Sequence, residues 1–191
     1  MVMVHGRNAT ADSILSLVPT IHTPGFAYLA PQAAGNTWYP NSFLAPIPTN
    51  EPGITSGLAA IDDLLETIRQ SGIPDERMML LGFSQGACLS VEYAASHARR
   101  YGGIACLSGG LIGPDGTRRN YPGSFDGRPV FMGCSDPDAH IPAQRVRESA
   151  AVLEKMGAVV TMRLYPQMGH TVNDDEIATV RSMMSAVLKD E

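Results

Sequence analysis

The clearest chemical signal in the sequence is the segment 82–86, which reads Gly-Phe-Ser-Gln-Gly and contains a Gly-x-Ser-x-Gly pattern. This pattern is typical of a nucleophilic serine on a sharp turn between a strand and a helix. Glycines have no Cβ, so they let strand and helix approach closely enough to accommodate a strained serine backbone. An apolar run at 78–81 precedes the turn and a helix-compatible run at 87–99 follows it. Ser84 is therefore the candidate nucleophile.

A serine hydroxyl is barely ionised at neutral pH, so Ser84 needs a neighbouring base. Of the five histidines, His170 follows a strand-like run at 158–165 and lies last in the chain. Serine turns of this kind occur with their partners in the order serine, aspartate, histidine, which His170 satisfies. A lone histidine after a strand can also simply hydrogen-bond a backbone carbonyl. Chain order and loop position favour His170 as the base.

Two aspartates, Asp136 and Asp138, compete for the role of the acid that orients the histidine. Both lie in the loop 134–142, which follows a strand-like run at 129–133. Either carboxylate would orient the imidazole and stabilise its cationic form. Aspartates before a helix often only cap it, and a helix is expected to begin near Pro142. Taken alone, the residues leave the choice open.

Acyl transfer also needs two backbone N–H groups that bind the negative charge developing on the carbonyl oxygen. The amide of Gln85 is one candidate, because it follows the serine at the start of a helix whose dipole favours negative charge. The second donor should come from a loop after an early strand. The segment 5–8, His-Gly-Arg-Asn, fits this position, and the amide of Arg7 is the candidate. His5 is expected to hold the loop through hydrogen bonds.

Strand-like and helix-like segments alternate along the whole chain. Strands are expected near 1–4, 26–30, 77–81, 103–107, 129–133 and 158–165, and helices near 11–18, 56–71, 87–97, 141–156 and 174–189. This alternation predicts an α/β fold with a mostly parallel sheet of about six strands and helices on both faces. Right-handed crossovers then place the loops after the strands along one edge of the sheet. No repeat or linker divides residues 1–191, so one domain is expected.

Two long loops at this edge are candidates for the walls of a substrate pocket. The proline-rich loop 32–55 carries Trp38, the only tryptophan, and the loop 108–128 carries Leu111. Loops of such length in compact proteins usually have a function. Large apolar side chains more often fill the core, which is the alternative for both residues. Trp38 and Leu111 are the substrate-binding candidates.

The composition excludes several classes of protein. Hydrophobic residues make up 44% of the chain and charged residues 17%, which excludes a disordered protein or a coiled coil. The net charge of −5 and the lack of a basic patch argue against a nucleic-acid partner. No apolar run reaches the length of a membrane span, so stable membrane insertion is not expected. The histidines lack the paired spacing of metal ligands, which argues against a metallohydrolase.

The three cysteines, Cys88, Cys106 and Cys134, lie in apolar or helical runs. An odd, scattered set predicts buried free thiols in a reducing compartment. The first six residues are too short and too uncharged to form a secretory signal. A cytoplasmic location is the resulting expectation.

Together these residues resemble the serine carboxylesterase, lysophospholipase and acyl-protein thioesterase group of the α/β-hydrolases. The matching segments lie at 5–7, 30–31, 38–39, 82–86, 107–109, 138–142 and 168–170, and so span nearly the whole chain. Gly-Phe-Ser-Gln-Gly is much more specific than the bare serine pattern. The resemblance implies a compact, capless α/β-hydrolase fold without a cofactor. Because the His-Gly loop begins at the fifth residue, the sheet should be trimmed at its N-terminal edge.

The resemblance also bears on the choice of the acid. The family carries His-Gly-Asp-x-Asp-Pro-x-Val-Pro, in which the second aspartate belongs to the catalytic triad. Laid without gaps on the segment 134–142, this position falls on Asp138 rather than Asp136. Positions 134, 135 and 139 depart from the family pattern. At Arg7 the acyl-protein thioesterases tend to carry a small apolar residue, and a charged side chain there argues against a purely lipid-like substrate.

The expected activity is hydrolysis of small or single-chain carboxylic esters through an acyl-enzyme on Ser84, with a small-molecule ester as the partner. One alternative is a dienelactone-hydrolase-like activity on cyclic esters, although that family commonly carries cysteine at the serine turn. A second alternative is a non-catalytic ligand-binding protein on a hydrolase scaffold, although no member of the triad is missing. The sequence makes no prediction about the oligomeric state.

Overall fold

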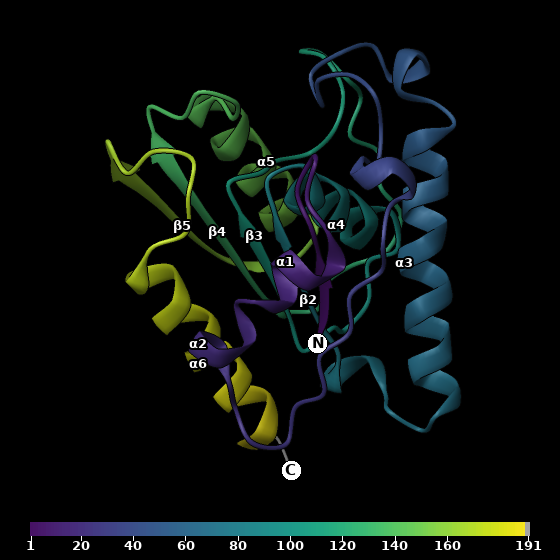
Figure 1. Cartoon of the computed structure of the whole chain (residues 1–191), viewed down its shortest axis with the longest axis vertical. Helices are drawn as coiled ribbons and strands as arrows, with labels where there is room; N and C mark the ends of the chain where they lie inside the picture. The colour runs from purple at the N-terminus through teal and green to yellow at the C-terminus, as the bar shows by residue number, and fades with distance from the viewer. Residues whose placement is uncertain (190–191) are drawn as a thin grey trace.

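The computed structural model describes residues 1–189, which form a sheet of five strands covered by helices (Figure 1). The strands are β1 (Val2–Val4), β2 (Met79–Phe83), β3 (Gly103–Leu107), β4 (Pro129–Asp136) and β5 (Val159–Pro166). They lie in the sheet in the order β1-β2-β3-β4-β5, and every pair is parallel. The carboxyl ends of all five strands therefore meet at one edge, as the alternation of segments predicted.

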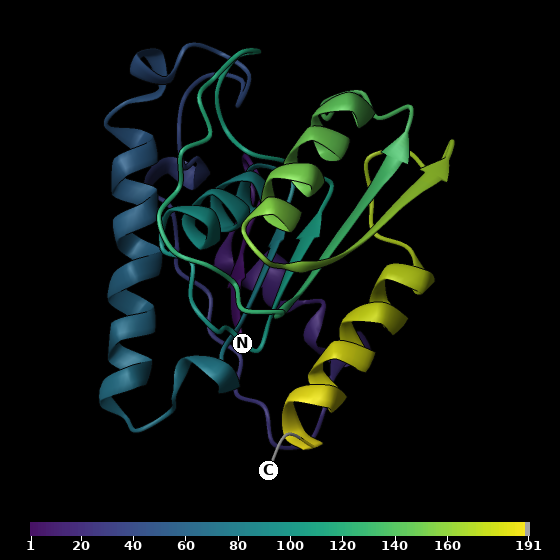
Figure 2. The same cartoon turned by 180° about the vertical axis from the view of Figure 1, so that it is seen from behind.

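Helices pack on both faces of this sheet (Figures 1 and 2). The α-helices are α1 (Ala11–Leu15), α2 (Val18–Ile21), α3 (Gly53–Gln70), α4 (Gln85–Ser96), α5 (Ala143–Lys155) and α6 (Asp174–Lys189), and the short 3-10 helices are η1 (Ala34–Asn36), η2 (Ile47–Asn50) and η3 (Asp75–Arg77). One face is covered by α3, α4 and α5, and the other by α1, α2 and α6. Across the described residues, no helix has both the length and the apolar character needed to cross a bilayer.

The strands contribute apolar side chains to two separate core clusters. Leu80 and Ile104 pack in the cluster beneath α3, α4 and α5, whereas Leu81 and Ala105 pack in the cluster beneath α1, α2 and α6. Successive residues of a strand point to opposite faces, so a parallel sheet buried on both sides needs a continuous apolar run. This requirement explains why the segment leading into the serine turn is uniformly apolar.

The sheet has one strand fewer than predicted. Residues 26–30 form only an isolated parallel bridge, between Leu29 and Val2. The N–H of Met3 donates to the carbonyl of Leu29 over 2.8 Å, but the pairing does not extend into a strand. β1 has only three residues, and Pro31 has no N–H with which to continue a ladder. The segment 26–30 instead covers part of the outer side of β1, which is the edge strand of the sheet.

Candidate active site

The turn between β2 and α4 holds Ser84 in a strained backbone conformation. Its φ is 55° and its ψ is −122°, a combination that residues other than glycine rarely adopt. A Cβ added to Gly82 would collide with the backbone of Gly86, and one added to Gly86 would collide with the carbonyl of Val4. The two glycines of the pattern are therefore required by the close approach of strand and helix, as the sequence predicted.

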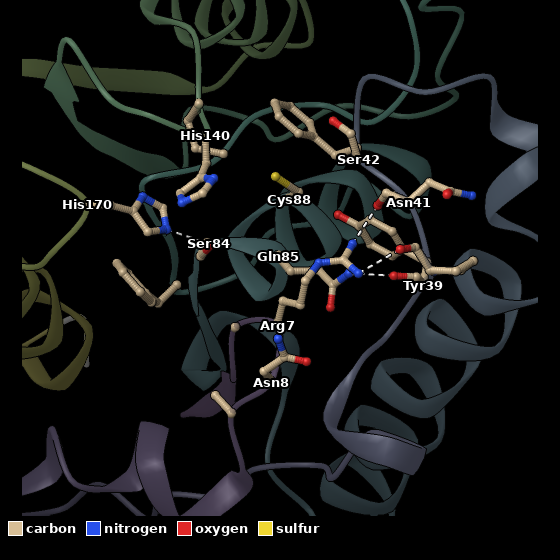
Figure 3. A pocket seen from close by; sticks show the side chains of 16 residues that line it. Arg7, Asn8, Tyr39, Asn41, Ser42, Ser84, Gln85, Cys88, His140 and His170 are labelled. Atoms are coloured by element: carbon tan, nitrogen blue, oxygen red, sulfur yellow. Dashed lines mark hydrogen bonds between the residues drawn. The ribbon is translucent and has the colours of Figure 1, made fainter.

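Three side chains from three loops form a continuous hydrogen-bonded series. His170 Nε2 lies 2.8 Å from Ser84 Oγ, a contact drawn in Figure 3, and His170 Nδ1 lies 2.8 Å from Asp138 Oδ2. Ser84 follows β2, Asp138 follows β4 and His170 follows β5, so the parallel strands bring all three to one edge. A hydroxyl, an imidazole and a carboxylate in this order have the geometry that nucleophilic catalysis requires.

The surroundings of Asp138 keep its carboxylate charged. The side chain is buried, and burial alone would raise its pKa. Hydrogen bonds from His170 and from the amides of His140 (2.7 Å) and Ile141 (3.0 Å) outweigh burial and hold the pKa of Asp138 below its ordinary value. The ionised carboxylate is the form that orients an imidazole and stabilises its cation.

Asp136 lies outside this series. Its side chain is 47% exposed, and its Oδ2 lies 3.8 Å from a guanidinium nitrogen of Arg147. Of the two aspartates that the residues left open, the structure brings Asp138 to His170. Asp138 also accepts hydrogen bonds from two amides of the loop that precedes α5. The same side chain therefore orders this loop and contacts the histidine.

The loop that carries His170 is fastened to the neighbouring loop. Ser135 Oγ accepts a hydrogen bond of 2.9 Å from the N–H of Gly169. The imidazole lies against the ring of Phe83, at a centroid distance of 5.0 Å, and against the ring of His140, at 4.8 Å. These contacts fix the position of the imidazole next to Ser84 before any substrate binds.

The backbone amides of Arg7 and Gln85 are placed close to Ser84. A Cβ added to Gly6 would lie 3.4 Å from the Cβ of Ser84, so the loop that carries Arg7 passes directly beside the serine. Gln85 is the first residue of α4, where the helix dipole favours an anion. Within residues 1–189, neither amide donates to a protein acceptor. Both N–H groups are thus free to donate to a substrate oxygen.

A cavity of about 470 Å³ opens over Ser84 (Figure 3). Its lining consists of residues 6–9, 39–43, 83–85, 88, 140–141 and 170. The cavity therefore contains the serine, the histidine and both candidate amide donors. Its volume lies in the range of small-molecule sites.

Trp38 and Leu111 do not line this cavity, which corrects the prediction from the sequence. Trp38 is 6% exposed, and its indole N–H donates to the carbonyl of His5 over 2.9 Å. A buried indole N–H needs an acceptor, so this bond turns the ring inward. Leu111 is 1% exposed and belongs to the core cluster beneath α3, α4 and α5. The walls from the same long loop as Trp38 are Tyr39 and Phe43 instead.

Comparison with known proteins identifies the family of the chain. The family model described as phospholipase/carboxylesterase matches residues 3–188. The chain belongs to the phospholipase/carboxylesterase family. This result confirms the resemblance inferred from the serine turn and the histidine loops.

Curated relatives of this phospholipase/carboxylesterase chain include two fungal proteins named acyl-protein thioesterase 1. The protein of Gibberella zeae is 29% identical over 141 residues, which cover 69% of this chain and 57% of the relative. The protein of Aspergillus fumigatus is 27% identical over 145 residues, which cover 74% of this chain and 60% of the relative. The matched stretches span less than two thirds of these relatives.

Solved structures of similar proteins match over nearly the whole chain. The crystal structure of a phospholipase/carboxylesterase from Dyadobacter fermentans has a TM-score of 0.92 and 45% sequence identity, and the match covers 98% of this chain and 88% of that one. The structure of SOBER1 from Arabidopsis thaliana has a TM-score of 0.82 at 17% identity and covers 98% of both chains, which shows a shared fold.

In this member of the phospholipase/carboxylesterase family, the side chain of Gln85 has a task that the sequence did not reveal. Its Oε1 accepts from the N–H of Trp38 over 2.9 Å, and its Nε2 donates to the carbonyl of Tyr39 over 2.8 Å. The buried amide thus fixes the start of the loop that lines the cavity. No spacing rule identifies this role, because Gln85 occupies a variable position of Gly-x-Ser-x-Gly.

Cys88 lines the cavity but is unsuited to compete with Ser84 as a nucleophile. Burial raises the pKa of its thiol to about 12, and the thiolate is the reactive form of a cysteine. Cys88 therefore forms part of the cavity wall. In the described part of the chain, no three His, Cys, Asp or Glu side chains are grouped so that they would hold a metal ion.

Glu176 is a buried carboxyl with incomplete hydrogen bonding. It lies in the first turn of α6, is 0% exposed and presses against Gly133 of β4. Oε2 accepts from the N–H of Asn173 over 3.0 Å, whereas Oε1 has no partner among the described residues. Burial raises the pKa of Glu176 to about 7.

Glu176→Gln is expected to weaken the pH dependence of stability between pH 4.5 and about 7. Over this range the unfolded carboxyl has lost its proton while the folded one keeps it. The free energy of unfolding of the wild type therefore falls as the pH rises and levels off above pH 7. The decrease due to this group is on the order of 3 kcal/mol. Urea unfolding at pH 5 and pH 8 should show a correspondingly smaller difference in the variant.

Glu154→Gln is the matched control, because Glu154 is an exposed residue of α5. This control should keep the wild-type difference between pH 5 and pH 8. An unchanged difference in Glu176→Gln would show that another group dominates the pH dependence.

Proposed function

We propose that this chain is a serine hydrolase that cleaves carboxylic esters through an acyl-enzyme on Ser84, with residues 1–191 acting as one domain. The observation that carries the proposal is the hydrogen-bonded series Ser84–His170–Asp138 at an open cavity. Membership in the phospholipase/carboxylesterase family supports the reaction class. The names of the relatives, acyl-protein thioesterase and carboxylesterase, support acyl transfer to water.

In the first step, His170 removes the proton from Ser84 Oγ while this oxygen bonds to the carbonyl carbon of the ester. The electron pair of the carbonyl moves onto its oxygen, which gives a tetrahedral intermediate. When the intermediate collapses, the bond to the alcohol oxygen breaks and His170 donates its proton to the leaving alcohol. The carboxylate of Asp138 stabilises the imidazolium that exists between the two proton transfers. The step ends with an ester of Ser84 and a free alcohol.

The amides of Arg7 and Gln85 are the proposed donors to the oxyanion of the intermediate. Each such donor contributes about 3–4 kcal/mol to the stability of the transition state. Their position depends on two nearby backbone arrangements, the Gly6 loop and the first turn of α4. Substitution of a side chain removes neither donor.

In the second step, a water molecule replaces the alcohol. His170 accepts a proton from the water as its oxygen attacks the acyl carbon, and then returns a proton to Ser84 Oγ as the acid leaves. Neither step requires a cofactor. Asp138 keeps the same role in both steps, because it accepts from Nδ1 throughout.

The cavity supports small or single-chain acyl esters as the substrates, since its volume of about 470 Å³ is modest and its walls combine Tyr39 and Phe43 with polar loop residues. The serine at the turn supports this activity over a dienelactone-hydrolase-like one, which commonly uses cysteine there. The free, buried thiols of Cys88, Cys106 and Cys134 support a reducing, cytoplasmic location.

Hydrolysis of p-nitrophenyl esters with acyl chains of two, four, eight and sixteen carbons tests the proposal directly. We expect measurable kcat/KM for the shorter chains and a decline at sixteen carbons. A fluorophosphonate probe should add covalently to the wild type at Ser84, as located by peptide mass spectrometry, and should abolish hydrolysis. Failure of both hydrolysis and labelling would favour a non-catalytic binding protein on a hydrolase scaffold.

A further inference from the structure

The lining of the cavity over Ser84 includes a cationic side chain and no carboxylate, since the buried carboxylate of Asp138 contacts His170 from outside the lining. Arg7 lies in its wall, and no Asp or Glu belongs to its lining. This distribution contrasts with the chain as a whole, which has 19 acidic residues against 14 Lys and Arg. A cationic side chain on the wall of a cavity attracts anionic ligands to that wall.

The guanidinium of Arg7 is held in place by neutral groups only. Its two terminal nitrogens donate to the carbonyls of Pro40, over 2.7 Å, and Asn41, over 2.5 Å. The guanidinium carbon lies 5.9 Å from the centre of the Tyr39 ring. These contacts leave the positive charge uncompensated, and three of the five N–H groups of the guanidinium remain available.

Seven other arginines of the chain are paired with carboxylates. The pairs within 4.0 Å involve Arg69, Arg99, Arg100, Arg119, Arg145, Arg147 and Arg163. In the part of the chain that the structure describes, no carboxylate pairs with Arg7. Arg7 thus combines three features that indicate ligand binding: a position in the cavity wall, fixed orientation and an unpaired charge.

The side chain of Arg7 lies in the same cavity as the atoms that would react. Its own backbone amide is a proposed oxyanion donor, so the side chain starts beside the carbonyl that Ser84 attacks. Figure 3 shows the guanidinium extending from there toward Tyr39 and Asn41, on the opposite side of Ser84 from His170. A substrate bound for attack would therefore extend one of its ends along Arg7.

We propose that Arg7 selects esters that carry a carboxylate, by binding this carboxylate through its free N–H groups. A guanidinium matches the two oxygens of a carboxylate in a parallel pair of hydrogen bonds. Arg7 is in this sense a specificity-determining residue for the proposed hydrolase, and the inference rests on that proposed function. The carboxylate belongs either to the acyl part or to the alcohol part of the ester, and matched substrates distinguish the two.

Two pairs of substrates with and without a carboxylate test the inference. For the acyl part, mono-p-nitrophenyl adipate is compared with p-nitrophenyl hexanoate. For the alcohol part, 4-acetoxybenzoate is compared with 4-acetoxybenzamide. The quantity measured is the ratio of kcat/KM for the anionic ester to that for its neutral partner, after subtraction of the uncatalysed rate. In the wild type at low ionic strength, one pair should give a ratio of about ten or more.

Variants of Arg7 should change this ratio in a graded way. Arg7→Gln should lower it by about tenfold, mainly through KM, because the charge is lost, whereas Arg7→Lys should restore part of it. Added salt should lower the wild-type ratio and leave that of Arg7→Gln nearly constant. Arg147→Gln is the matched control, since Arg147 lies outside the cavity lining; it should keep the wild-type ratio. Use of a ratio removes any general effect of Arg7 variants on the adjacent oxyanion donor.

The outcomes separate this inference from the proposed function. Hydrolysis of both members of each pair with ratios that Arg7→Gln does not change would overturn the role of Arg7 and leave the serine hydrolase intact. Preference of the wild type for the neutral ester in both pairs would overturn it equally. Absence of hydrolysis for all four esters, together with absence of fluorophosphonate labelling, would overturn the serine hydrolase and the inference with it.

Discussion

Ser84→Ala is expected to lower kcat for p-nitrophenyl butyrate by a factor of about 10⁵. Without Oγ no acyl-enzyme forms, and the remaining rate comes only from water that attacks an ester bound at the oxyanion donors. Initial rates with the wild type and the variant at equal concentration measure the effect. The variant should also lose fluorophosphonate labelling, which excludes a second reactive nucleophile.

Ser90→Ala is the matched control for this substitution. Ser90 lies on α4, the helix that follows the serine turn, and is 0% exposed. Its hydroxyl has no hydrogen-bond partner among the described residues. Its removal should leave kcat within about twofold of the wild type, because no polar contact is lost. Near-wild-type hydrolysis by a folded Ser84→Ala variant would refute the acyl-enzyme on Ser84.

Asp138→Asn is expected to lower kcat by a factor of about 10³–10⁴, whereas Asp136→Asn should change it by less than about threefold. An asparagine at 138 presents either an amide N–H or a neutral oxygen to His170. The first holds the imidazole in the wrong tautomer, and the second no longer stabilises its cation. Among the described residues, the side chain of Asp136 pairs with Arg147 at the surface and not with His170, so its charge has little effect on the imidazole.

Kinetics of the two aspartate variants with the same ester give a direct ranking. Far-ultraviolet circular dichroism and melting temperature of both variants provide the control for folding, because Asp138 also accepts from two loop amides. A larger loss of kcat in Asp136→Asn than in Asp138→Asn would assign the orienting acid to Asp136. Equal, small losses in both would show that neither Asp136 nor Asp138 assists His170.

Local chemistry in the sequence predicted the serine turn and the loops that carry its partners. The turn that holds Ser84 needs residues without a Cβ at positions 82 and 86. A short sequence pattern with two glycines is therefore enough to predict it. The choice of Asp138 over Asp136 needed the family resemblance, because both aspartates lie in one loop. Only the tertiary contact with His170 distinguishes them physically.

The pocket walls and the number of strands were less predictable. The loop that carries Trp38 does line the cavity. The direction of the Trp38 ring, however, depends on the carbonyl of His5, an acceptor 33 residues away in the sequence. The segment 26–30 has the composition of a strand, yet its pairing stops at one bridge beside the three-residue β1. Neither outcome follows from local propensity, since each is decided by a partner distant in the chain.

The arrangement of β1 has a consequence for the order in which activity appears during synthesis. Val2 pairs with Leu80, and the Gly6 loop reaches Ser84 only when this edge strand has docked. Arg7 and His170 come from opposite ends of the chain and line one cavity. Pairings between segments far apart in sequence form slowly, because closing the long intervening loop costs conformational entropy before the contacts are made. Under the proposed mechanism, ester hydrolysis therefore reports completed folding, because a nascent chain that ends before His170 lacks the proposed base.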